Sequence, residues 1–234
     1  MGFAKDLRAS VLQAAMQGKL TEQLETDTPV SALLADIKAE KDRLISEKKI
    51  KKEKPLSAIS DDDISFDIPE SWTWVNLGDI SYTNGGFAFK SSDYSNVGVR
   101  VIRISDFSNI GISNKQVVRH PYNESLAQYK IKENDILMCM TGGTVGKCCI
   151  VKCVDEEMVT NQRVANITSV KVLPKFLYSI LSGPIIQEII NRNKNSTNDN
   201  ISMDLITTFP IPIPPIEEQE RIVQRIEEIK RSFP

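Results

Sequence analysis

The segment of this sequence most like a phosphate-binding loop is TGGTVGKC, which spans residues 141–148. Its spacing does not suit nucleotide hydrolysis, because only three residues separate Gly142 from Gly146 and Cys148 stands where Ser or Thr would bind magnesium. A glycine-rich turn followed by Lys147 can still offer backbone N–H groups and one cation to a phosphate, including a DNA phosphate. A hairpin turn with a solvated lysine explains the segment equally well.

The remaining residues offer no catalytic centre. The only histidine is His120, and the four cysteines at 139, 148, 149 and 153 show no CxxC spacing. A zinc site is therefore not predicted, and the cysteines are expected to be buried or half-buried thiols. The acidic run 155–157 is typical of a solvated turn. The sequence also lacks the motifs of adenine methyltransferases and of nucleases, so we expect a chain without catalytic activity, bound metal or bound cofactor.

The composition is that of an ordinary globular protein, with 41% hydrophobic and 26% charged residues in a chain of 234. No apolar run is long enough to span a membrane, and residues 1–17 lack the pattern of a secretory signal. We therefore expect a cytoplasmic protein that does not contact a membrane. The net charge of −2 argues against coating nucleic acid by bulk charge, so any DNA binding must be local.

Basic residues are concentrated in the middle of the chain. Residues 90–199 carry more Lys and Arg than Asp and Glu, although the whole chain is acidic. The same zone is rich in Asn, Gln, Ser and Thr, whose side chains hydrogen-bond to base edges and phosphates. This pattern fits a DNA-binding domain, and it also fits a mildly basic domain without that function.

Two helices are predicted before the basic middle zone of the chain. Apolar residues recur at helical steps near the N-terminus, and Gly18 indicates where the first helix ends. In the second helix, Asp27 or Thr28 is the expected N-cap and Pro29 the first helical residue. The lysine run 48–54 is expected at its C-terminus, where cations complement the helix dipole.

The middle of the chain has the pattern of a mixed α+β domain. Residues 55–67 are polar and acidic and indicate a linker. Short β-rich runs such as 99–104 follow, separated by Gly, Asn and Ser clusters. One apolar helix is predicted over 173–190, and the Gly-Pro pair at 183–184 should kink or split it.

The end of the chain returns to a helical pattern. Prolines are too dense over 210–215 for a central strand, so an extended connector is predicted there. A helix should start at Pro215, with Glu217 and Glu218 in its first turn. The apolar faces of the two terminal helices need partners that one short helix cannot supply. The predicted dimer or subunit interface comprises Leu7, Val11, Ala14, Ile222, Ile226 and Ile229.

Several segments, taken together and in order, resemble the specificity subunit of Type I restriction–modification systems. In that family, target-recognition domains alternate with conserved spacer helices. The segments are 7–20 (LRASVLQAAMQGKL), 39–44 (AEKDRL), 68–80 (IPESWTWVNLGDI), 135–137 (DIL), 141–147 with Asn161-Gln162, and 212–223 (PIPPIEEQERIV). The resemblance covers nearly the whole chain, and its motifs are specific as a set rather than singly.

The resemblance implies an α+β fold, with one globular mixed α/β recognition domain flanked by long spacer helices in a bundle or coiled coil across a dimer. The implied domains are spacer helices over 1–54, a linker over 55–67, the target-recognition domain over 68–210 and the start of a spacer helix over 211–234. A usual subunit is longer and has a pair of recognition domains. Two copies of this chain would restore that arrangement; a truncated or fragmentary chain is the alternative.

By resemblance, the chain would bind double-stranded DNA and dock methyltransferase subunits that carry S-adenosylmethionine, and through them the restriction subunits. A helical protein–protein scaffold without DNA sequence recognition is the alternative. Each DNA candidate could also be an ordinary surface-loop residue or, at 161 and 162, make a structural hydrogen bond. The candidates are Thr141, Gly142, Gly143, Thr144 and Lys147 for phosphate, Asn161, Gln162 and Arg163 for bases or backbone, and Lys90, Ser91 and Arg103 as further contacts.

Overall fold

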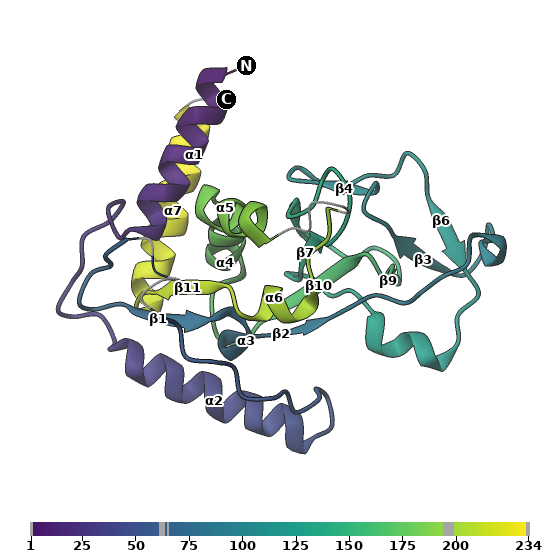
Figure 1. Cartoon of the computed structure of the whole chain (residues 1–234), viewed down its shortest axis with the longest axis horizontal. Helices are drawn as coiled ribbons and strands as arrows, with labels where there is room; N and C mark the ends of the chain where they lie inside the picture. The colour runs from purple at the N-terminus through teal and green to yellow at the C-terminus, as the bar shows by residue number, and fades with distance from the viewer. Residues whose placement is uncertain (1, 61–63, 65, 194–198, 233–234) are drawn as a thin grey trace. The chain divides into compact units, whose positions relative to one another are not determined.

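The computed structural model describes residues 2–60, 64, 66–193 and 199–232, and Figure 1 shows their course. The chain forms two compact units whose segments alternate along the sequence. The two units do not follow the boundaries predicted at 68 and 210, because 68–82 and 169–189 group with the terminal helices. Unit 1 is Met1–Tyr82, Ser169–Ile189 and Ile206–Pro234, and unit 2 is Thr83–Thr168 and Ile190–Leu205.

The described residues contain seven α-helices. The predicted break at the Gly-Pro pair 183–184 is confirmed, because one helix ends at Leu181 and the next begins at Pro184. The helices are α1 (Gly2–Met16), α2 (Val30–Ser46), α3 (Leu77–Ile80), α4 (Pro174–Leu181), α5 (Pro184–Asn193), α6 (Met203–Thr207) and α7 (Ile216–Ser232).

The helices at the two ends of the chain, α1 and α7, lie side by side in unit 1, with both termini at the same end of the pair (Figure 1). Helix α4 packs against both of them. Met16 of α1 and Ile222 and Ile226 of α7 are buried in this cluster. Helix α1 ends just before Gly18, as predicted. The φ of Gly18 is +67°, and a Cβ there would lie 2.4 Å from the Pro69 ring, so glycine is required.

The proline-rich segment is a strand and not only a connector. Pro210–Ile213 forms β11, which pairs antiparallel with β1, Thr73–Asn76, and places Pro212 opposite Trp74. A two-stranded sheet has only edge strands, so proline is tolerated there although it cannot donate a ladder hydrogen bond. This pairing is the reason that the residues around β1 belong to unit 1.

Helix α2 departs from the prediction at both ends. Pro29 occupies the N-cap position rather than the first helical position and makes no side-chain cap. The predicted caps, Asp27 and Thr28, bond to α7 instead. The helix ends at Ser46, so the lysine run 48–54 lies beyond its last turn and is not explained by the helix dipole.

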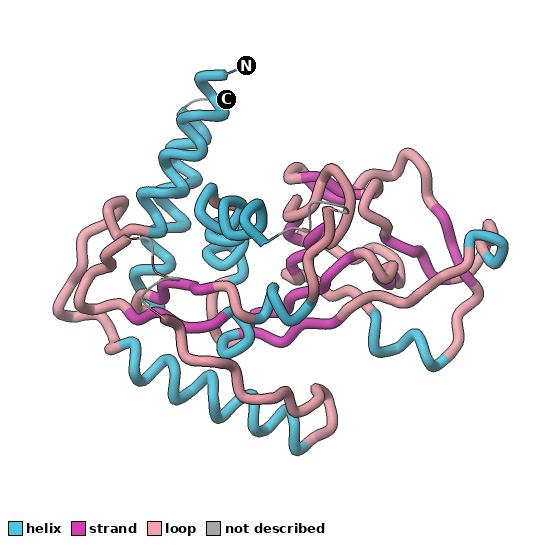
Figure 2. The backbone as a smooth tube through the Cα atoms, viewed as in Figure 1, coloured by secondary structure: helices cyan, strands magenta, loops and turns pink. Residues whose placement is uncertain are grey.

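Unit 2 is built mainly from short strands and loops (Figure 2). Two 3₁₀ turns, η2 (Ser91–Asp93) and η3 (Glu124–Tyr129), interrupt them. The strands are β2 (Ser81–Asn84), which leads into the unit, β3 (Val99–Ile102), β4 (Phe107–Ser108), β5 (Gly111–Ile112), β6 (Val118–His120), β7 (Ile136–Cys139), β8 (Cys148–Ile150), β9 (Met158–Thr160) and β10 (Val164–Ser169).

The strands of this unit form three sheets. The largest has the order β2-β10-β7-β8 and is antiparallel where β10 meets β7 and where β7 meets β8. A second sheet has the order β6-β3-β9, in which β3 runs parallel to β9. Strands β4 and β5 form a small hairpin. Together with the helices, these sheets confirm the predicted mixed α/β architecture.

Two apolar clusters fill the interior of unit 2. One contains Phe107, Leu137 and Val164, and the other contains Phe89 and Leu126. Phe107, Leu137 and Val164 lie on the short strands β4, β7 and β10, and loops connect the strands of this unit. The candidate DNA contacts lie on such loops.

Three of the four cysteines are buried, as expected, whereas Cys153 is exposed. Burial raises the pKa of the Cys149 thiol to about 11, so this group is neutral at physiological pH. Within the described ranges, no group of three His, Cys, Asp or Glu residues could hold a metal ion. A search of the same ranges finds no helix with the length and apolar character of a membrane span.

Candidate nucleic-acid interface

The loop 161–163 of unit 2 is joined by main-chain hydrogen bonds to three other segments. The Asn161 amide donates to the Ile102 carbonyl and the Gln162 amide to the Phe87 carbonyl, both at 2.9 Å. The Arg163 carbonyl accepts the Met140 amide at 3.0 Å. The segments that carry most of the sequence candidates are therefore brought together in one region. They include the glycine loop, defined here as residues 141–147, which follows Met140 directly.

The glycine loop is a hairpin between β7 and β8, as one of the two interpretations of the sequence predicts. Gly142 and Gly146 have φ values of +78° and +80°, a backbone conformation that glycine adopts without strain. The Gly142 amide donates to the Asp199 carbonyl at 2.7 Å, which ties the loop to a further segment that the sequence did not indicate. Gly143 and Thr144 are exposed at the tip.

Two of the predicted DNA contacts, Lys147 for phosphate and Arg103 as a further contact, are engaged inside unit 2. The Lys147 ammonium donates to the Ile104 carbonyl at 2.7 Å and lies 5.2 Å from the centre of the Phe107 ring, so this lysine is not the solvated one that the sequence suggested. The Arg103 guanidinium makes two hydrogen bonds of 2.8 Å to Asp106, which raise the pKa of Arg103. Both cations hold neighbouring segments in place.

Other candidates remain open to a ligand. Within the described ranges, neither Arg163 nor Lys90 has an acidic partner for its cationic group. The Asn161 side chain instead accepts the Arg163 amide at 3.2 Å, which is a structural hydrogen bond of the turn. Thr141 is half-buried, and its hydroxyl is buried without a hydrogen-bond partner in the described part of the chain. The exposed candidates are Lys90, Ser91, Gly142, Gly143, Thr144, Gln162 and Arg163.

Gly86 permits the close approach of the segment before Phe87 to the loop 161–163. A Cβ at Gly86 would lie only 2.1 Å from the Asn161 carbonyl oxygen, whereas a Cβ at Gly85 would meet nothing within 4 Å. This role of Gly86 was not predicted from the sequence. The available signal was the Gly-Gly pair itself, because glycine beside a strand often marks a close backbone approach.

Asp135 supports the largest sheet of unit 2, β2-β10-β7-β8, from its interior. It is 1% exposed, and its carboxylate accepts hydrogen bonds from the Lys132 amide (2.8 Å), the Asn166 side chain (2.9 Å) and the Thr168 hydroxyl (2.6 Å). Burial raises the pKa of Asp135, and these hydrogen bonds only partly oppose the shift. Because Asp135 precedes β7 and its side-chain partners are on β10, it fixes the two strands that lead to the candidate loops.

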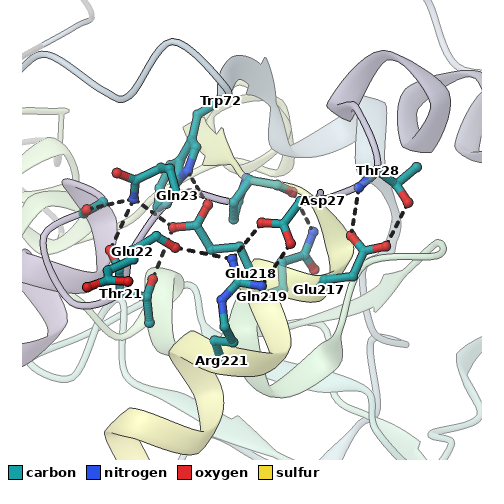
Figure 3. A network of polar contacts seen from close by, with 12 residues as sticks. Thr21, Glu22, Gln23, Asp27, Thr28, Trp72, Glu217, Glu218, Gln219 and Arg221 are labelled. Carbon is teal, nitrogen blue, oxygen red and sulfur yellow. Dashed lines mark hydrogen bonds and ion pairs between the residues drawn. The ribbon is translucent and has the colours of Figure 1, made fainter. Parts of the chain in front are cut away.

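A second polar cluster surrounds the first turn of α7 in unit 1 (Figure 3). Glu218 is fully buried there. One of its oxygens accepts the Thr21 hydroxyl at 3.0 Å and the Gln23 amide at 2.8 Å, and the other accepts the Trp72 indole N–H at 2.8 Å. These hydrogen bonds satisfy a carboxylate that burial would otherwise make costly.

The neighbouring residues of α7 bind the same N-terminal loop. Arg221 makes two hydrogen bonds to Asp27, at 2.9 and 2.5 Å, and these lower the pKa of Asp27. Glu217 accepts a hydrogen bond from the Thr28 hydroxyl at 2.6 Å. Gln219 accepts one from the backbone amide of Leu173, just before α4, at 3.0 Å. These contacts form a junction cluster in which four of the five polar residues of the motif EEQER have hydrogen-bond partners outside α7. It comprises Thr21, Gln23, Asp27, Thr28, Trp72, Glu217, Glu218, Gln219 and Arg221.

The predicted apolar interface is partly used within one chain. Ile222 is fully buried and Ile226 is 2% exposed, so these two are not open to a second copy, which corrects the prediction for them. The reason is that α1 and α4 cover this part of α7. A cavity of about 140 Å³ nearer the chain termini is lined by residues of both terminal helices. The predicted interface residues that stay half-buried are Leu7, Val11, Ala14 and Ile229.

The sequence of this chain is similar to those of known proteins. The family described as the Type I restriction modification DNA specificity domain matches residues 69–233. The Type I restriction enzyme EcoAI specificity subunit of Escherichia coli is 32% identical over 231 residues, which cover 95% of this chain and 39% of that protein. The EcoEI specificity subunit of the same organism is 26% identical over 241 residues, with the same two coverages.

Solved structures share the fold. The HsdS subunit from Thermoanaerobacter tengcongensis superposes with a TM-score of 0.57 at 15% identity, covering 96% of this chain and 60% of that one. A chain from work on complex assembly and conformational transition of the type I R-M system gives a TM-score of 0.58 at 19% identity, covering 98% and 51%. This chain therefore belongs to the family of Type I restriction–modification specificity subunits. It spans 39% of the length of the two curated relatives described above.

Proposed function

We propose that this chain is a non-catalytic, cytoplasmic specificity subunit that reads DNA through unit 2. The observation that carries the proposal is the set of open cationic and polar side chains on loops tied together by main-chain hydrogen bonds. Lys90 and the tip of the glycine loop would position the protein on phosphates. Gln162 and Arg163 have the side chains that bind adenine and guanine edges in the major groove.

The terminal helices would set the spacing between two such readers. In this proposal, a second copy pairs with the first along α1 and α7, burying Leu7, Val11 and Ile229 across a two-fold axis. A helix of 17 residues such as α7 is about 26 Å long, the length of about seven to eight base pairs of duplex. Two identical units would then recognise an inverted repeat with a gap.

The wider assembly follows from the family. Methyltransferase subunits carrying S-adenosylmethionine would dock on this chain, and restriction subunits would join through them. DNA sequence choice would belong to this chain, and chemistry would belong to those partners. No metal or cofactor is assigned to this chain in the proposal.

The salt dependence of duplex binding tests the DNA contacts. Each cation that neutralises a phosphate contributes about one unit to the slope of log affinity against log salt. The slope should fall by about one for Lys90→Ala, whereas it should stay unchanged for Lys115→Ala, an exposed lysine outside the candidate set. Arg163→Ala should weaken binding and change which bases are preferred. Failure of the native chain to bind any duplex, whatever the salt, would favour the protein–protein scaffold.

A further inference from the structure

A groove in unit 1 lies between α2 and the segment 50–56, which runs back along the helix (Figure 1). Its volume is about 550 Å³, a size that accommodates several side chains of a partner. The floor is apolar. Ile37 and Val75 are buried there, and Leu34, Ile45, Ile50 and Leu56 are half-buried.

The edge of the groove is basic on balance, because five lysines line it together with three acidic residues, Asp42, Glu53 and Asp79. Lys38 is paired with Asp42 at 3.0 Å, and Lys41 lies 4.0 Å from Glu53. The three other lysines that line the groove are exposed, and within the described ranges they have no acidic partner. These lysines are Lys51, Lys52 and Lys54.

Contacts among the described residues do not account for Lys51, Lys52 and Lys54. Helix α2 ends at Ser46, so they do not stabilise its C-terminus. They lie on the same groove as Leu34, Ile45 and Ile50, and a DNA backbone of phosphates and sugars has no aliphatic side chain that could fill such a floor. A partner segment with an aliphatic face flanked by carboxylates would bury the apolar floor of the groove and pair with the lysines at its edge.

We propose that this groove docks an amphipathic helix with an acidic flank, carried by the methyltransferase subunit. Aliphatic side chains of that helix bury the half-exposed floor, and its carboxylates pair with Lys51, Lys52 and Lys54. The inference rests on the proposed function, in which methyltransferase subunits bind this chain. It adds the surface that binds them and the chemistry of the segment that they present.

The test measures two affinities for the full chain, one for the co-encoded methyltransferase subunit and one for a random-sequence duplex. The double variant Lys51→Glu, Lys52→Glu should lose about tenfold in affinity for the subunit, because attraction becomes repulsion at two positions. Its affinity for the duplex should not change. Ile50→Ala should also weaken subunit binding without any change of charge. The matched control is Lys19→Glu, Lys175→Glu, which reverses two exposed lysines of unit 1 outside the groove.

Three results would overturn the docking proposal. Full retention of subunit affinity by the lysine variant, with the native chain binding, would show that the subunit binds elsewhere. A loss of duplex affinity with subunit binding intact would assign the lysines to DNA. If the native chain does not bind the subunit, this proposal and the partner part of the proposed function fail together, while the duplex measurement still tests DNA binding. Equal thermal unfolding of all variants shows that the changes are local.

Discussion

At the scale of single residues, two adjacent glycines should behave differently. Gly86→Ala places a Cβ 2.1 Å from the Asn161 carbonyl oxygen, whereas Gly85→Ala meets open space. Because the obstacle is backbone, the loop 161–163 must shift, and we expect Gly86→Ala to cost about 1–3 kcal/mol in unfolding free energy. The measurement is chemical denaturation of both variants, together with duplex affinity.

In this comparison Gly85→Ala is the control, and it should change stability by less than about 0.5 kcal/mol. A Gly86→Ala chain that is as stable and binds duplex as well as the native chain would show that the close approach has no role in holding the candidate loops.

The candidate site was only partly accessible to sequence reasoning. Residue type indicated the glycine loop and the polar run 161–163, and both lie in the assembled region. Residue type could not show which cationic side chains are free to bind a ligand and which are bonded within the fold. Lys147 and Arg103 are cationic residues like Lys90, yet each is bonded to a group that the fold brings near. Such partners depend on strand pairing and cannot be read from composition.

At the scale of elements, the junction cluster should hold α7 against the N-terminal loop. Arg221 is 29% exposed and bonds twice to Asp27, which is 6% exposed. Arg221→Ala leaves that carboxylate without its cation, and we expect a loss of about 1–3 kcal/mol in unfolding free energy. Arg225→Ala is the matched control. Its ion pair with Glu228 is more than half exposed on the arginine side, so the loss should be under about 1 kcal/mol.

A double-mutant cycle with Asp27→Asn separates the pair from the rest of the cluster. A coupling energy near zero would mean that the two residues do not stabilise each other, despite their geometry. The attachment of α7 to the N-terminal loop would then depend on Glu218 and its three hydrogen-bond donors.

The same pair gives a pH dependence with a definite sign. The hydrogen bonds from Arg221 lower the pKa of Asp27 in the folded chain. Its stabilising contribution is therefore complete above the unfolded carboxyl pKa, about 3.9, and is lost as the pH falls through the lower folded value. The stability difference between the native chain and Asp27→Asn should shrink as the pH is lowered from about 6 to about 3. A difference that stays constant over that range would contradict the assignment.

Elements were predictable where the signal was local. The end of α1 at Gly18 and the break between α4 and α5 follow from glycine and proline at single positions. The strand β11 was not predictable, because its partner β1 lies far away in the sequence. For the same reason Asp27 and Thr28 were expected to cap α2, whereas their partners are on α7.

At the scale of the whole molecule, the proposed pairing of two copies has a simple consequence for mass. Light scattering at high micromolar concentration should give twice the 26.2 kDa of one chain. Ile229→Asp should give the monomer mass, because it places a charge in the half-buried seam of α1 and α7. Arg225→Ala, on the exposed part of α7, should remain a dimer. A native chain that is monomeric at this concentration would exclude the two-fold assembly.

Enrichment from a library of random duplexes measures whether this chain selects particular DNA sequences. The purified chain is used with and without its co-encoded methyltransferase subunit. We predict enrichment of an inverted repeat with a fixed gap, and loss of that preference in Arg163→Ala. Enrichment of a single ungapped half-site would support DNA recognition by one unit and contradict the spacing of two units by a two-fold assembly. No enrichment under either condition would contradict DNA sequence selection by this chain and favour a scaffold that binds only protein.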